Sequence, residues 1–547
     1  MQDRPLLIPS LLRHAAAVSP HHEIVSLAPG PSAQRLDFMT IEERSRALAQ
    51  ALVRFGIGEG DRVASLAWNT HRHLELFYGV PGCGAVLHTV NPRYSDEQIA
   101  YIVNHAGDRV LFFDPDLAPL VARLAPRLET VEHYVMLGTS AERSDAGLDL
   151  TAYEDLLGDG DFTWPSLDER AAALLCYTSG TTGHPKGVLT SHRSNVIHAL
   201  AAQSACAFGL TPLDSVLLIV PMFHAYGWGI PYVAALSGAK LVLPGPTPTP
   251  ATCVRLIGAE AVSLAMGVPT VWNGILDHLD AVGGTLRPLK RALVGGSAVP
   301  PGLARRLTAA HGLELVTGWG MTELSPLGSF TGLTPAIAGL DEHERESVMA
   351  ARAGRLLYPL EARIVGPDGR ELPWNGHDFG DVQVRGPCVA SAYFGQEATE
   401  ADAHGWFPTG DIGTIDCHGT IAITDRSKDL IKSGGEWISS ADIERAAASV
   451  ASVETAAAIA VEHPKWQERP LLLLVPRRGK SVDLGAVRAA LASALPSWQQ
   501  PDDILIVDAI PLTATGKIDK KQLRAIYGAH LVRAAGVDAT SMVGTTI

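Results

Sequence analysis

Thr178-Ser179-Gly180-Thr181-Thr182-Gly183-His184-Pro185-Lys186-Gly187 is the stretch on which the interpretation of this sequence rests. It directly follows an apolar run, Ala172 to Tyr177, whose length and flanking turn residues predict a buried strand. Its glycines permit positive φ angles and close backbone approach, its hydroxyl groups can donate hydrogen bonds, and Lys186 adds a positive charge. These are the parts of a phosphate-binding loop, although the Gly-x4-Gly-Lys-Ser/Thr spacing of a Walker A loop is absent. Taken alone, such a stretch is more often only a flexible loop.

The same pattern, a short apolar run that stops at Gly, Pro, Ser or Thr, recurs along the chain. The further runs are Val216 to Val220, Ala292 to Val294 and Leu313 to Thr317, and they alternate with helical patterns such as Ile41 to Phe55. This alternation predicts an α/β fold of parallel sheets flanked by helices. Because ligands of such sheets bind beyond the carboxyl ends of the strands, the polar loops should converge on one crevice. We expect a helix after each run, including the one that ends at Tyr177.

The character of the sequence changes past Asp425, where a charged stretch leads into Ser433-Gly434-Gly435-Glu436. The segment beyond it predicts helices at Ala441 to Ala448 and Leu484 to Leu495, and strands at Thr455 to Val461, Leu471 to Val475 and Ile504 to Val507. These elements form a compact α+β unit near the minimum size of an independent domain. We therefore expect a large domain over residues 1–425 and a small one over residues 431–547, with the boundary near Lys428.

Length and charge limit the class of protein. A chain of 547 residues with 46% apolar and 19% charged residues fits a folded multidomain enzyme. The net charge of -14 argues against general attraction to nucleic acid or to an anionic membrane. The six cysteines lie far apart without Cys-x-x-Cys spacing, which disfavours a zinc site or a disulfide framework and suits a reducing cytoplasm. Neither a signal peptide nor a transmembrane span is expected.

Further motifs follow the loop at Thr178 in order: Pro221-Met222-Phe223-His224, Gly318 to Glu323, Thr409-Gly410-Asp411, Arg426 to Glu436, and Pro511 to Lys517. Over nearly the whole chain they resemble the signatures of the acyl-adenylate-forming superfamily, which contains acyl-CoA synthetases, luciferases and the adenylation domains of peptide synthetases. Within it, the chain is most similar to medium- and long-chain fatty acyl-CoA ligases, through His88 to Arg93 and Ser433 to Ile438. The resemblance implies a large N-terminal domain of helix-flanked sheets with a small β-barrel subdomain, and a mobile C-terminal domain on a hinge at residues 426–430.

The resemblance also implies an activity. It indicates an ATP- and Mg²⁺-dependent acid–thiol ligase that converts a medium- or long-chain fatty acid to acyl-AMP, releases pyrophosphate, and then transfers the acyl group to coenzyme A with release of AMP. The alternative is an adenylating enzyme that loads an aryl or cyclic acid onto CoA, a carrier protein or an amine. A catalytically silent relative is disfavoured, because it would have no physical need for Lys186, Glu323, Asp411, Arg426 and Lys517 together.

The resemblance assigns a site role to each residue that matches one of the family's motifs. Those expected at the reacting groups are Lys517, Glu323, Thr322, His224 and Lys186. Those expected to bind ATP or CoA are Thr178, Ser179, Gly180, Thr181, Thr182, Gly183, Gly295, Gly296, Ser297, Gly318, Trp319, Gly320, Met321, Asp411, Arg426, Lys428, Gly434, Gly435 and Glu436. Thr178 and Glu323 are the expected Mg²⁺ ligands, since hard oxygen donors suit this ion. The acyl pocket is expected to be formed by Tyr226, Gly227, Trp228, Met266, Gly267, Val268, Pro269 and residues 328–330.

The resemblance implies individual roles, and each has a plainer alternative. Lys517 is expected to reach the carboxylate of the acid and the α-phosphate, where an ammonium is worth roughly 2–4 kcal/mol; otherwise it is a solvated lysine. Trp319 is expected to stack on adenine; otherwise it is a core tryptophan. His224 is expected to border the carboxylate and the acyl tunnel; otherwise it is a core histidine. It need not act as a base, because a carboxylate is already ionised at pH 7.

The expected partners are small molecules: a carboxylic acid, ATP and CoA. We expect no contact with nucleic acid and no integral membrane contact, and no basic amphipathic helix is visible in the sequence. The hydrophobic substrate allows transient contact with a membrane surface, and the family resemblance allows a homodimer.

Overall fold

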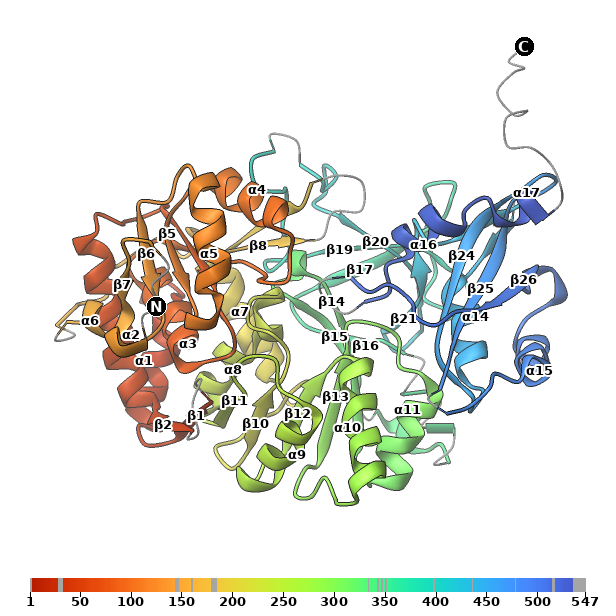
Figure 1. Cartoon of the computed structure of the whole chain (residues 1–547), viewed down its shortest axis with the longest axis horizontal. Coiled ribbons are helices and arrows are strands. Elements are labelled where there is room, and N and C mark those ends of the chain that lie inside the picture. The colour runs from red at the N-terminus through yellow and green to blue at the C-terminus, as the bar shows by residue number, and fades with distance from the viewer. Residues whose placement is uncertain are drawn as a thin grey trace, which may run out of the picture.

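The structure, a computed structural model, describes residues 2–27, 33–142, 147–158, 161–178, 184–332, 334–341, 344–345, 348–349, 352–396, 399–434, 436–477, 479–513 and 517–534. Six of the predicted site residues lie outside the described residues: Ser179, Gly180, Thr181, Thr182, Gly183 and Gly435. The N-terminal elements lie at one end of the molecule, the central elements in the middle and the C-terminal elements at the other end (Figure 1).

A seven-stranded sheet forms the N-terminal end, in the order β7-β6-β5-β3-β4-β8-β9. Its strands are β3 (Arg62–Leu66), β4 (Val86–Thr89), β5 (Asp108–Phe113), β6 (His133–Met136), β7 (Thr151–Ala152), β8 (Ala172–Thr178) and β9 (Lys186–Ser191). All neighbours pair in parallel except β8 and β9. The helices of this part of the chain are α1 (Ile8–Val18), α2 (Phe38–Arg54), α3 (His71–Gly82), α4 (Asp96–Ala106), α5 (Ala118–Leu124), α6 (Tyr153–Leu156) and α7 (His192–Gln203).

A fourteen-stranded sheet forms the middle, in the order β18-β17-β19-β20-β21-β16-β15-β14-β13-β12-β10-β11-β1-β2. Its strands are β1 (Glu23–Ser26), β2 (Gln34–Asp37), β10 (Ser215–Leu218), β11 (Lys240–Leu243), β12 (Leu264–Gly267), β13 (Arg291–Gly295), β14 (Glu314–Gly320), β15 (Leu327–Phe330), β16 (Gly354–Leu356), β17 (Glu361–Val365), β18 (Glu371–Leu372), β19 (Gly380–Arg385), β20 (Phe407–Ile415) and β21 (Thr420–Arg426). The run from β1 through β11, β10, β12, β13 and β14 is parallel. The helices here are α8 (Ile230–Ser237), α9 (Pro250–Ala259), α10 (Pro269–Val282), α11 (Pro301–Arg305) and α12 (Pro335–Ala338).

One hydrophobic cluster joins the two large sheets. It contains buried side chains of both sheets, such as Val63 and Leu218, and of helices α1, α3, α7 and α8. Because these helices carry apolar residues on the faces that meet both sheets, the N-terminal and middle parts of the chain share one core. The carboxyl ends of β8, β13 and β14 carry the loops that the sequence assigns to the site.

The C-terminal segment forms a separate five-stranded sheet with hydrophobic clusters of its own. Its strands are β22 (Ile431–Ser433), β23 (Glu436–Ile438), β24 (Val453–His463), β25 (Gln467–Pro476) and β26 (Asp503–Ile506), and its helices are α14 (Ser440–Ala448), α15 (Leu484–Ala494), α16 (Lys520–Tyr527) and α17 (His530–Ala534). Every helix and strand predicted for this unit is present. The division into domains at residues 426–430 stays a prediction.

The α/β class is confirmed, and the local expectations need three corrections. A strand, β9, follows the loop after Thr178 where a helix was expected, because Val188 pairs with Cys176 in a buried hairpin. The run expected to end at Thr317 continues as β14 through Gly320, where it pairs with β15. Among the described residues, β16 to β21 do not close into a small barrel: β16 pairs with β15 on one side and β21 on the other, so they extend the middle sheet as an open antiparallel array.

The lengths and apolarity of the helices can be compared with those of a membrane span. Among the described residues, none of the helices combines the length and the apolarity that a membrane crossing requires. All six cysteines are free.

A buried ionic network fixes the N-terminal helices to each other. The carboxylate of Glu75, fully buried on α3, accepts hydrogen bonds from Arg44 Nε at 2.8 Å and from the Tyr153 hydroxyl at 2.6 Å. Burial raises the pKa of Glu75, and the charge of Arg44 opposes this shift. Arg44 therefore lowers the cost of a charged carboxylate at this buried position.

We predict that Arg44→Met lowers the free energy of unfolding by about 3 kcal/mol near pH 8, because Glu75 is left as a buried charge without its cation. The loss should be smaller at pH 5. The folded-state pKa of Glu75 lies above its unfolded value. The stability lost in the variant therefore grows as pH rises and the buried carboxyl ionises, and it fades at lower pH, where the buried carboxyl is protonated. Urea unfolding at the two pH values measures this. Arg385→Met, which breaks an exposed pair with Glu361, is the control and should change stability little; an equal effect of both variants would contradict the prediction.

Candidate active site

The ends of the predicted phosphate loop meet at the mouth of the β8–β9 hairpin. Thr178 and Lys186 are cross-strand partners, and the Thr178 hydroxyl donates to the Lys186 carbonyl at 3.4 Å. The Lys186 ammonium pairs with the Glu400 carboxylate at 3.0 Å and lies 4.3 Å from the centre of the Tyr393 ring. The hairpin therefore holds one cation at the mouth of the loop, between an acid and an aromatic ring.

Glu323 lies in a short turn, η6 (Thr322–Leu324), between β14 and β15. Its side chain is 4% exposed, and its Oε1 accepts a hydrogen bond from the Tyr393 hydroxyl at 2.8 Å. Burial raises the pKa of Glu323, while this hydrogen bond and the charge of Arg426 act in the opposite direction. A buried carboxylate with so few partners gains from a cation, so its chemistry fits a metal ligand.

The donor set suits Mg²⁺ in particular. Among the described residues, no group of three or more His, Cys, Asp or Glu side chains could form an all-protein metal cage. Mg²⁺ is usually held by one or two carboxylates, with phosphate oxygens and waters as its other ligands. Glu323, with the Thr178 hydroxyl as a second oxygen at the loop, is compatible with that arrangement.

Asp411 joins three strands through its carboxylate. Oδ2 accepts from the Trp319 indole N–H at 2.7 Å, and Oδ1 lies 3.3 Å from Nε of Arg426, its cross-strand partner. Trp319 is only 8% exposed, and a Cβ on Gly328 would lie 2.7 Å from the edge of its ring. Most of the indole surface is thus used in the core and in orienting Asp411, and stacking on adenine stays a prediction.

A left-handed turn follows the Pro221-to-His224 motif. Its residues are η4 (Ala225–Gly229), with φ angles of 37° at Ala225, 48° at Tyr226, 54° at Gly227, 51° at Trp228 and 81° at Gly229. Left-handed backbone costs non-glycine residues roughly 1–2 kcal/mol each, so the rest of the structure must hold this turn in place. Strain of this kind concentrates at functional sites.

The strained turn places Trp228 against the end of β13. A Cβ on Gly295 would lie 3.0 Å from the Trp228 ring, so a side chain here would require the indole to move. A Cβ on Gly296, which has a φ of 82°, would lie 3.7 Å from the same ring, 3.2 Å from Val268 and 3.9 Å from Cε of Lys517. An apolar wall and a lysine side chain therefore meet at this pair of glycines.

Lys517 comes from the C-terminal unit, on the segment that precedes α16. Its backbone N–H donates to the Thr513 hydroxyl at 3.2 Å, and Thr513 N–H donates to the Lys517 carbonyl at 2.7 Å, which shapes the turn. Burial lowers the pKa of Lys517, the charges of Arg426 and Lys428 act in the same direction and Asp411 acts against them, and together they bring the pKa to about 8. Burial also lowers the pKa of His224 to about 4, with Lys517 as a second cause. At pH 7 the site thus holds a charged lysine beside a neutral histidine.

The structure brings many of the predicted residues together and leaves others apart. Lys517, Gly296, Gly295 and Trp228 form one group; Lys186 and Glu323 are linked through Tyr393; and Trp319, Asp411 and Arg426 form another group. Gly318 and Gly320 lie within β14, Met321 precedes η6, Thr322 is buried in it, and Ser297 is exposed after β13. Lys428 is exposed between β21 and β22, and Gly434 and Glu436 lie at the β22–β23 hairpin of the small sheet.

Sequence reasoning missed three residues of the site. Tyr393 and Glu400 contact Glu323 and Lys186 across separations of 70 and 214 residues, respectively. His198 supports the strained turn, since a Cβ on Gly229 would lie 2.6 Å from its ring, and its Nε2 accepts from the Leu327 N–H at 3.0 Å. No local motif in the sequence marks these side chains.

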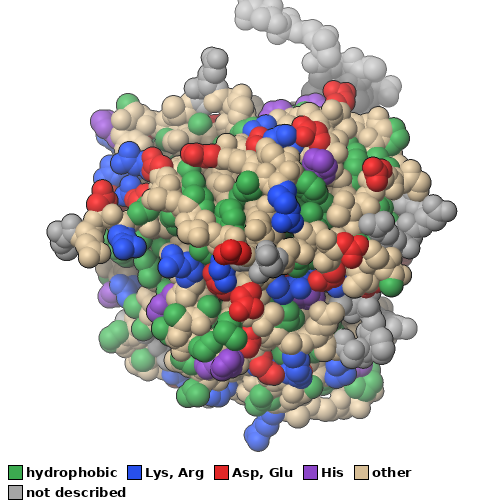
Figure 2. Space-filling model, turned by 90° about the vertical axis from the view of Figure 1, so that its left-hand side faces the viewer, with side chains coloured by type: hydrophobic (Ala, Val, Ile, Leu, Met, Phe, Trp, Pro, Cys, Tyr) green, Lys and Arg blue, Asp and Glu red, His purple; other side chains and the backbone are tan. Residues whose placement is uncertain are grey.

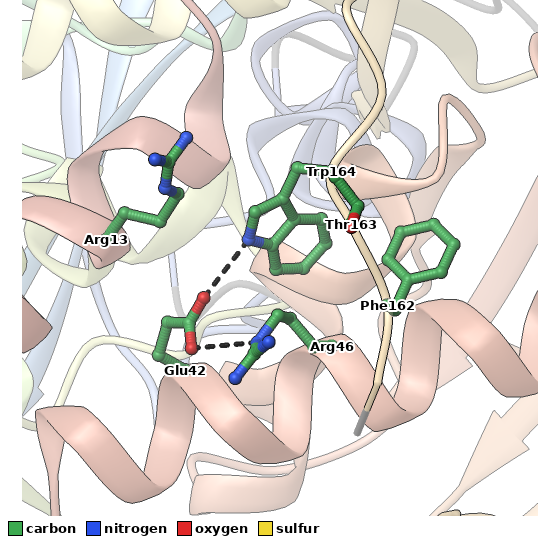
Figure 3. A pocket seen from close by; sticks show the side chains of 6 residues that line it. All are labelled: Arg13, Glu42, Arg46, Phe162, Thr163 and Trp164. Atoms are coloured by element: carbon green, nitrogen blue, oxygen red, sulfur yellow. Dashed lines mark hydrogen bonds and ion pairs between the residues drawn. The ribbon is translucent and has the colours of Figure 1, made fainter. Parts of the chain in front are cut away.

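A cavity of about 220 Å³ lies elsewhere, between α1, α2 and the segment 162–164. In Figure 3, the Glu42 carboxylate faces both the Trp164 indole N–H and the Arg46 guanidinium, with which it forms hydrogen bonds of 3.1 Å and 3.0 Å. On the face shown in Figure 2, Lys and Arg side chains are interspersed with Asp and Glu, so this face carries no broad basic patch. Neither feature is connected with the groups described above.

Comparison with known proteins adds independent evidence. Residues 12–394 match the AMP-binding enzyme family, and residues 442–517 match the AMP-binding enzyme C-terminal domain. The chain is 44% identical to a 3-methylmercaptopropionyl-CoA ligase of Ruegeria lacuscaerulensis, over 96% of this chain and 98% of that protein. It is 42% identical to a medium-chain-fatty-acid–CoA ligase of Ectopseudomonas oleovorans, over 98% of each chain. The solved structure of a Mycobacterium tuberculosis fatty acyl CoA synthetase superposes with a TM-score of 0.72 at 27% identity and covers 96% of this chain and 99% of that one.

The electrostatics of the lysine predict two shifts of opposite sign. Arg426→Gln should raise the pKa of Lys517 above about 8, because a neighbouring positive charge is removed, and Asp411→Asn should lower it, because an opposite charge is removed. The resonance of Lys517 in ¹³C-dimethylated protein, assigned with Lys517→Ala, reports this titration without substrates. Shifts of the same sign in both variants would show that Lys517 does not face these two groups.

Proposed function

The chain belongs to the AMP-binding enzyme family, and from this premise we propose that it is an ATP-dependent ligase that joins a fatty acid to coenzyme A. Its relatives at 42–44% identity are acid–CoA ligases by name, and they align over nearly their whole length. ATP-dependent ligation of an acid to CoA is therefore its reaction class. The proposal adds the substrate, a medium- or long-chain fatty acid, and the residues that carry out the steps.

One observation carries the assignment of the site. The Lys517 side chain, which belongs to the C-terminal unit, lies beside Gly296 and the Trp228 indole of the large unit. A polar cation and an apolar wall meet there, as a substrate with a carboxylate head and a hydrocarbon tail requires. The groups around Glu323, in η6 after β14, and around Asp411, on β20, supply binding groups for a nucleotide.

In the first step, the carboxylate attacks the α-phosphate of ATP, the bond to pyrophosphate breaks, and acyl-AMP forms. The carboxylate is already ionised, so no base is needed, and His224 with its pKa of about 4 stays neutral and borders the acid. The step needs stabilisation of negative charge that develops on the phosphoryl oxygens, and the Lys517 ammonium provides it. Bound Mg²⁺, held by Glu323, would neutralise phosphate oxygens, and Lys186 would leave Glu400 to pair with them.

In the second step, the thiol of CoA attacks the acyl carbonyl and AMP leaves. We assign residues 426–430 as the hinge that exchanges Lys517 for the glycine segment, with Gly434, Gly435 and Glu436 lining the path of the thiol. Gly434 has a φ of 60°, and a Cβ there would lie 2.7 Å from the Trp466 ring, so the hairpin itself favours glycine at this position. Closure of the two units excludes water, which protects the mixed anhydride.

The acyl pocket is proposed to begin at Trp228 and Val268, with buried Met266 behind them. The side chains of Val268 and Met266 are apolar and the Trp228 ring is largely so, which favours a hydrocarbon chain at about 0.8 kcal/mol for each buried methylene. Delivery of the acyl group to a carrier protein or an amine is the competing function. A cytoplasmic location and a homodimer stay predictions from the sequence.

The central experiment measures pyrophosphate release with ATP, Mg²⁺ and a graded series of fatty and aryl acids, with and without CoA. Lys517→Ala should lower the rate of adenylation about a hundredfold or more, because the developing phosphoryl charge loses its ammonium. Lys521→Ala, which removes an exposed lysine four residues further on, is the matched control. Pyrophosphate release without a CoA thioester would identify another acceptor, and no release with any acid would refute the proposal.

A second prediction concerns chain length. Trp228→Ala should shift the preference of the enzyme toward longer acids, because the indole fills the space beside Gly295 and its removal leaves room for further methylenes. The measurement is kcat/KM across the acid series. Trp374→Ala removes an exposed indole and should leave the preference unchanged. An unaltered profile for Trp228→Ala would place the acyl chain on another side of the site.

A further inference from the structure

A connection between β19 and β20 crosses the site, and we call its residues 388–394 the strap. At one end, Ala390 N–H donates to the Glu323 carbonyl at 2.8 Å, and the Ser325 hydroxyl donates to the Cys388 carbonyl at 2.9 Å. At the other end, Phe394 N–H donates to the Gly187 carbonyl at 2.8 Å. Backbone bonds thus tie the strap both to the turn that carries Glu323 and to the strand that carries Lys186.

Tyr393 is the strap residue whose side chain contacts both charged groups. Its hydroxyl donates to Glu323 Oε1 at 2.8 Å, and the Lys186 ammonium lies 4.3 Å from the centre of its ring. The ring also packs edge-on against buried Phe407, with ring centres 6.2 Å apart. The aromatic contact, the hydrogen bond and the cation–π contact together leave the side chain one orientation.

The hydroxyl and the ring of Tyr393 contact different groups. The phenol has a single proton to donate, and it goes to Glu323. The bond uses one carboxylate oxygen and fixes the plane of the group. The ring face attracts the ammonium without neutralising it, so Lys186 keeps its charge for an anion.

We propose that Tyr393 is a positioning residue that sets the Glu323 carboxylate and the Lys186 ammonium at the separation that a metal–triphosphate complex requires. The inference rests on the proposed function, in which Glu323 holds Mg²⁺ and Lys186 meets phosphate. Tyr393 itself touches neither the reacting atoms nor the acid. By positioning Glu323 and Lys186, Tyr393 raises the affinity of the protein for the metal-bound nucleotide.

The chain offers a matched control for the loss of one hydroxyl. The Tyr153 hydroxyl donates to buried Glu75 at 2.6 Å, so Tyr153→Phe removes the same kind of bond, between a tyrosine and a buried carboxylate, in the N-terminal part of the chain. Tyr393→Phe and Tyr153→Phe should lower the thermal unfolding temperature to a similar extent. Only Tyr393→Phe should alter nucleotide binding.

The experiment measures binding of α,β-methylene-ATP to the full-length protein by calorimetry, in Mg²⁺ and in EDTA, without acid or CoA. The readout is the Kd in EDTA divided by the Kd in Mg²⁺, and we call this ratio the gain from Mg²⁺. We expect Tyr393→Phe to lower the gain from Mg²⁺ about tenfold, the scale of a lost hydrogen bond to a charged group. Binding in EDTA should change little, because the ring beneath Lys186 is kept. In turnover, KM for ATP should rise and KM for the acid should not.

Glu323→Gln and the double variant separate the possible failures. If Glu323→Gln lowers the gain from Mg²⁺ and the double variant lowers it no further than Glu323→Gln alone, Tyr393 acts through Glu323 and the inference holds. If Glu323→Gln lowers the gain and Tyr393→Phe does not, Tyr393 is not a positioning residue. If neither variant changes the gain, the metal role of Glu323 in the proposed function fails. An equal loss of the gain in Tyr153→Phe would reduce the effect of Tyr393 to general stability and overturn the inference.

Discussion

The carboxylate of Asp411 accepts a hydrogen bond from the Trp319 indole at 2.7 Å and lies 3.3 Å from the Arg426 guanidinium, and the charge balance of the site depends on it. It is the negative group that opposes Arg426 and Lys428 in setting the pKa of Lys517. Without this anion, three cations would face one another at the junction of the two units, and the lysine would lose its proton more readily. The core tryptophan thus contributes to the charge state of a residue from the small unit.

Backbone strain is the second constraint on the site. The left-handed turn at Ala225–Gly229 includes three non-glycine residues in a conformation that each avoids in isolation. It is supported from behind by His198, which touches Gly229, and in front by Gly295, where the missing Cβ admits the Trp228 ring. Close packing on both sides offsets the strain, and the result is an indole held rigidly beside the place where a carboxylate is proposed to react.

Much of the fold follows from local patterns. The runs that end at Tyr177, Val294 and Thr317 predict strands because apolar stretches followed by turn residues are a signal within a few neighbouring positions. The strand β9 was missed because a short apolar segment after a loop suits a helix or a strand, and only its pairing with β8 decides between them. The motif that contains Trp319 is local, but the burial of its ring depends on β15 and on Gly328.

The sequence by itself determined the α/β class, the family, the reaction class and the motif residues such as Lys517, Glu323 and Asp411, because these signals lie in short segments that carry their own chemistry. Only the tertiary structure decided which side chains meet. Tyr393 and Glu400 reach Glu323 and Lys186 across 70 and 214 residues, and the lowered pKa of Lys517 arises from burial and charges on other strands. The physical reason is that contacts between strands and the desolvation of charged groups depend on packing in three dimensions, which no local pattern of residues encodes.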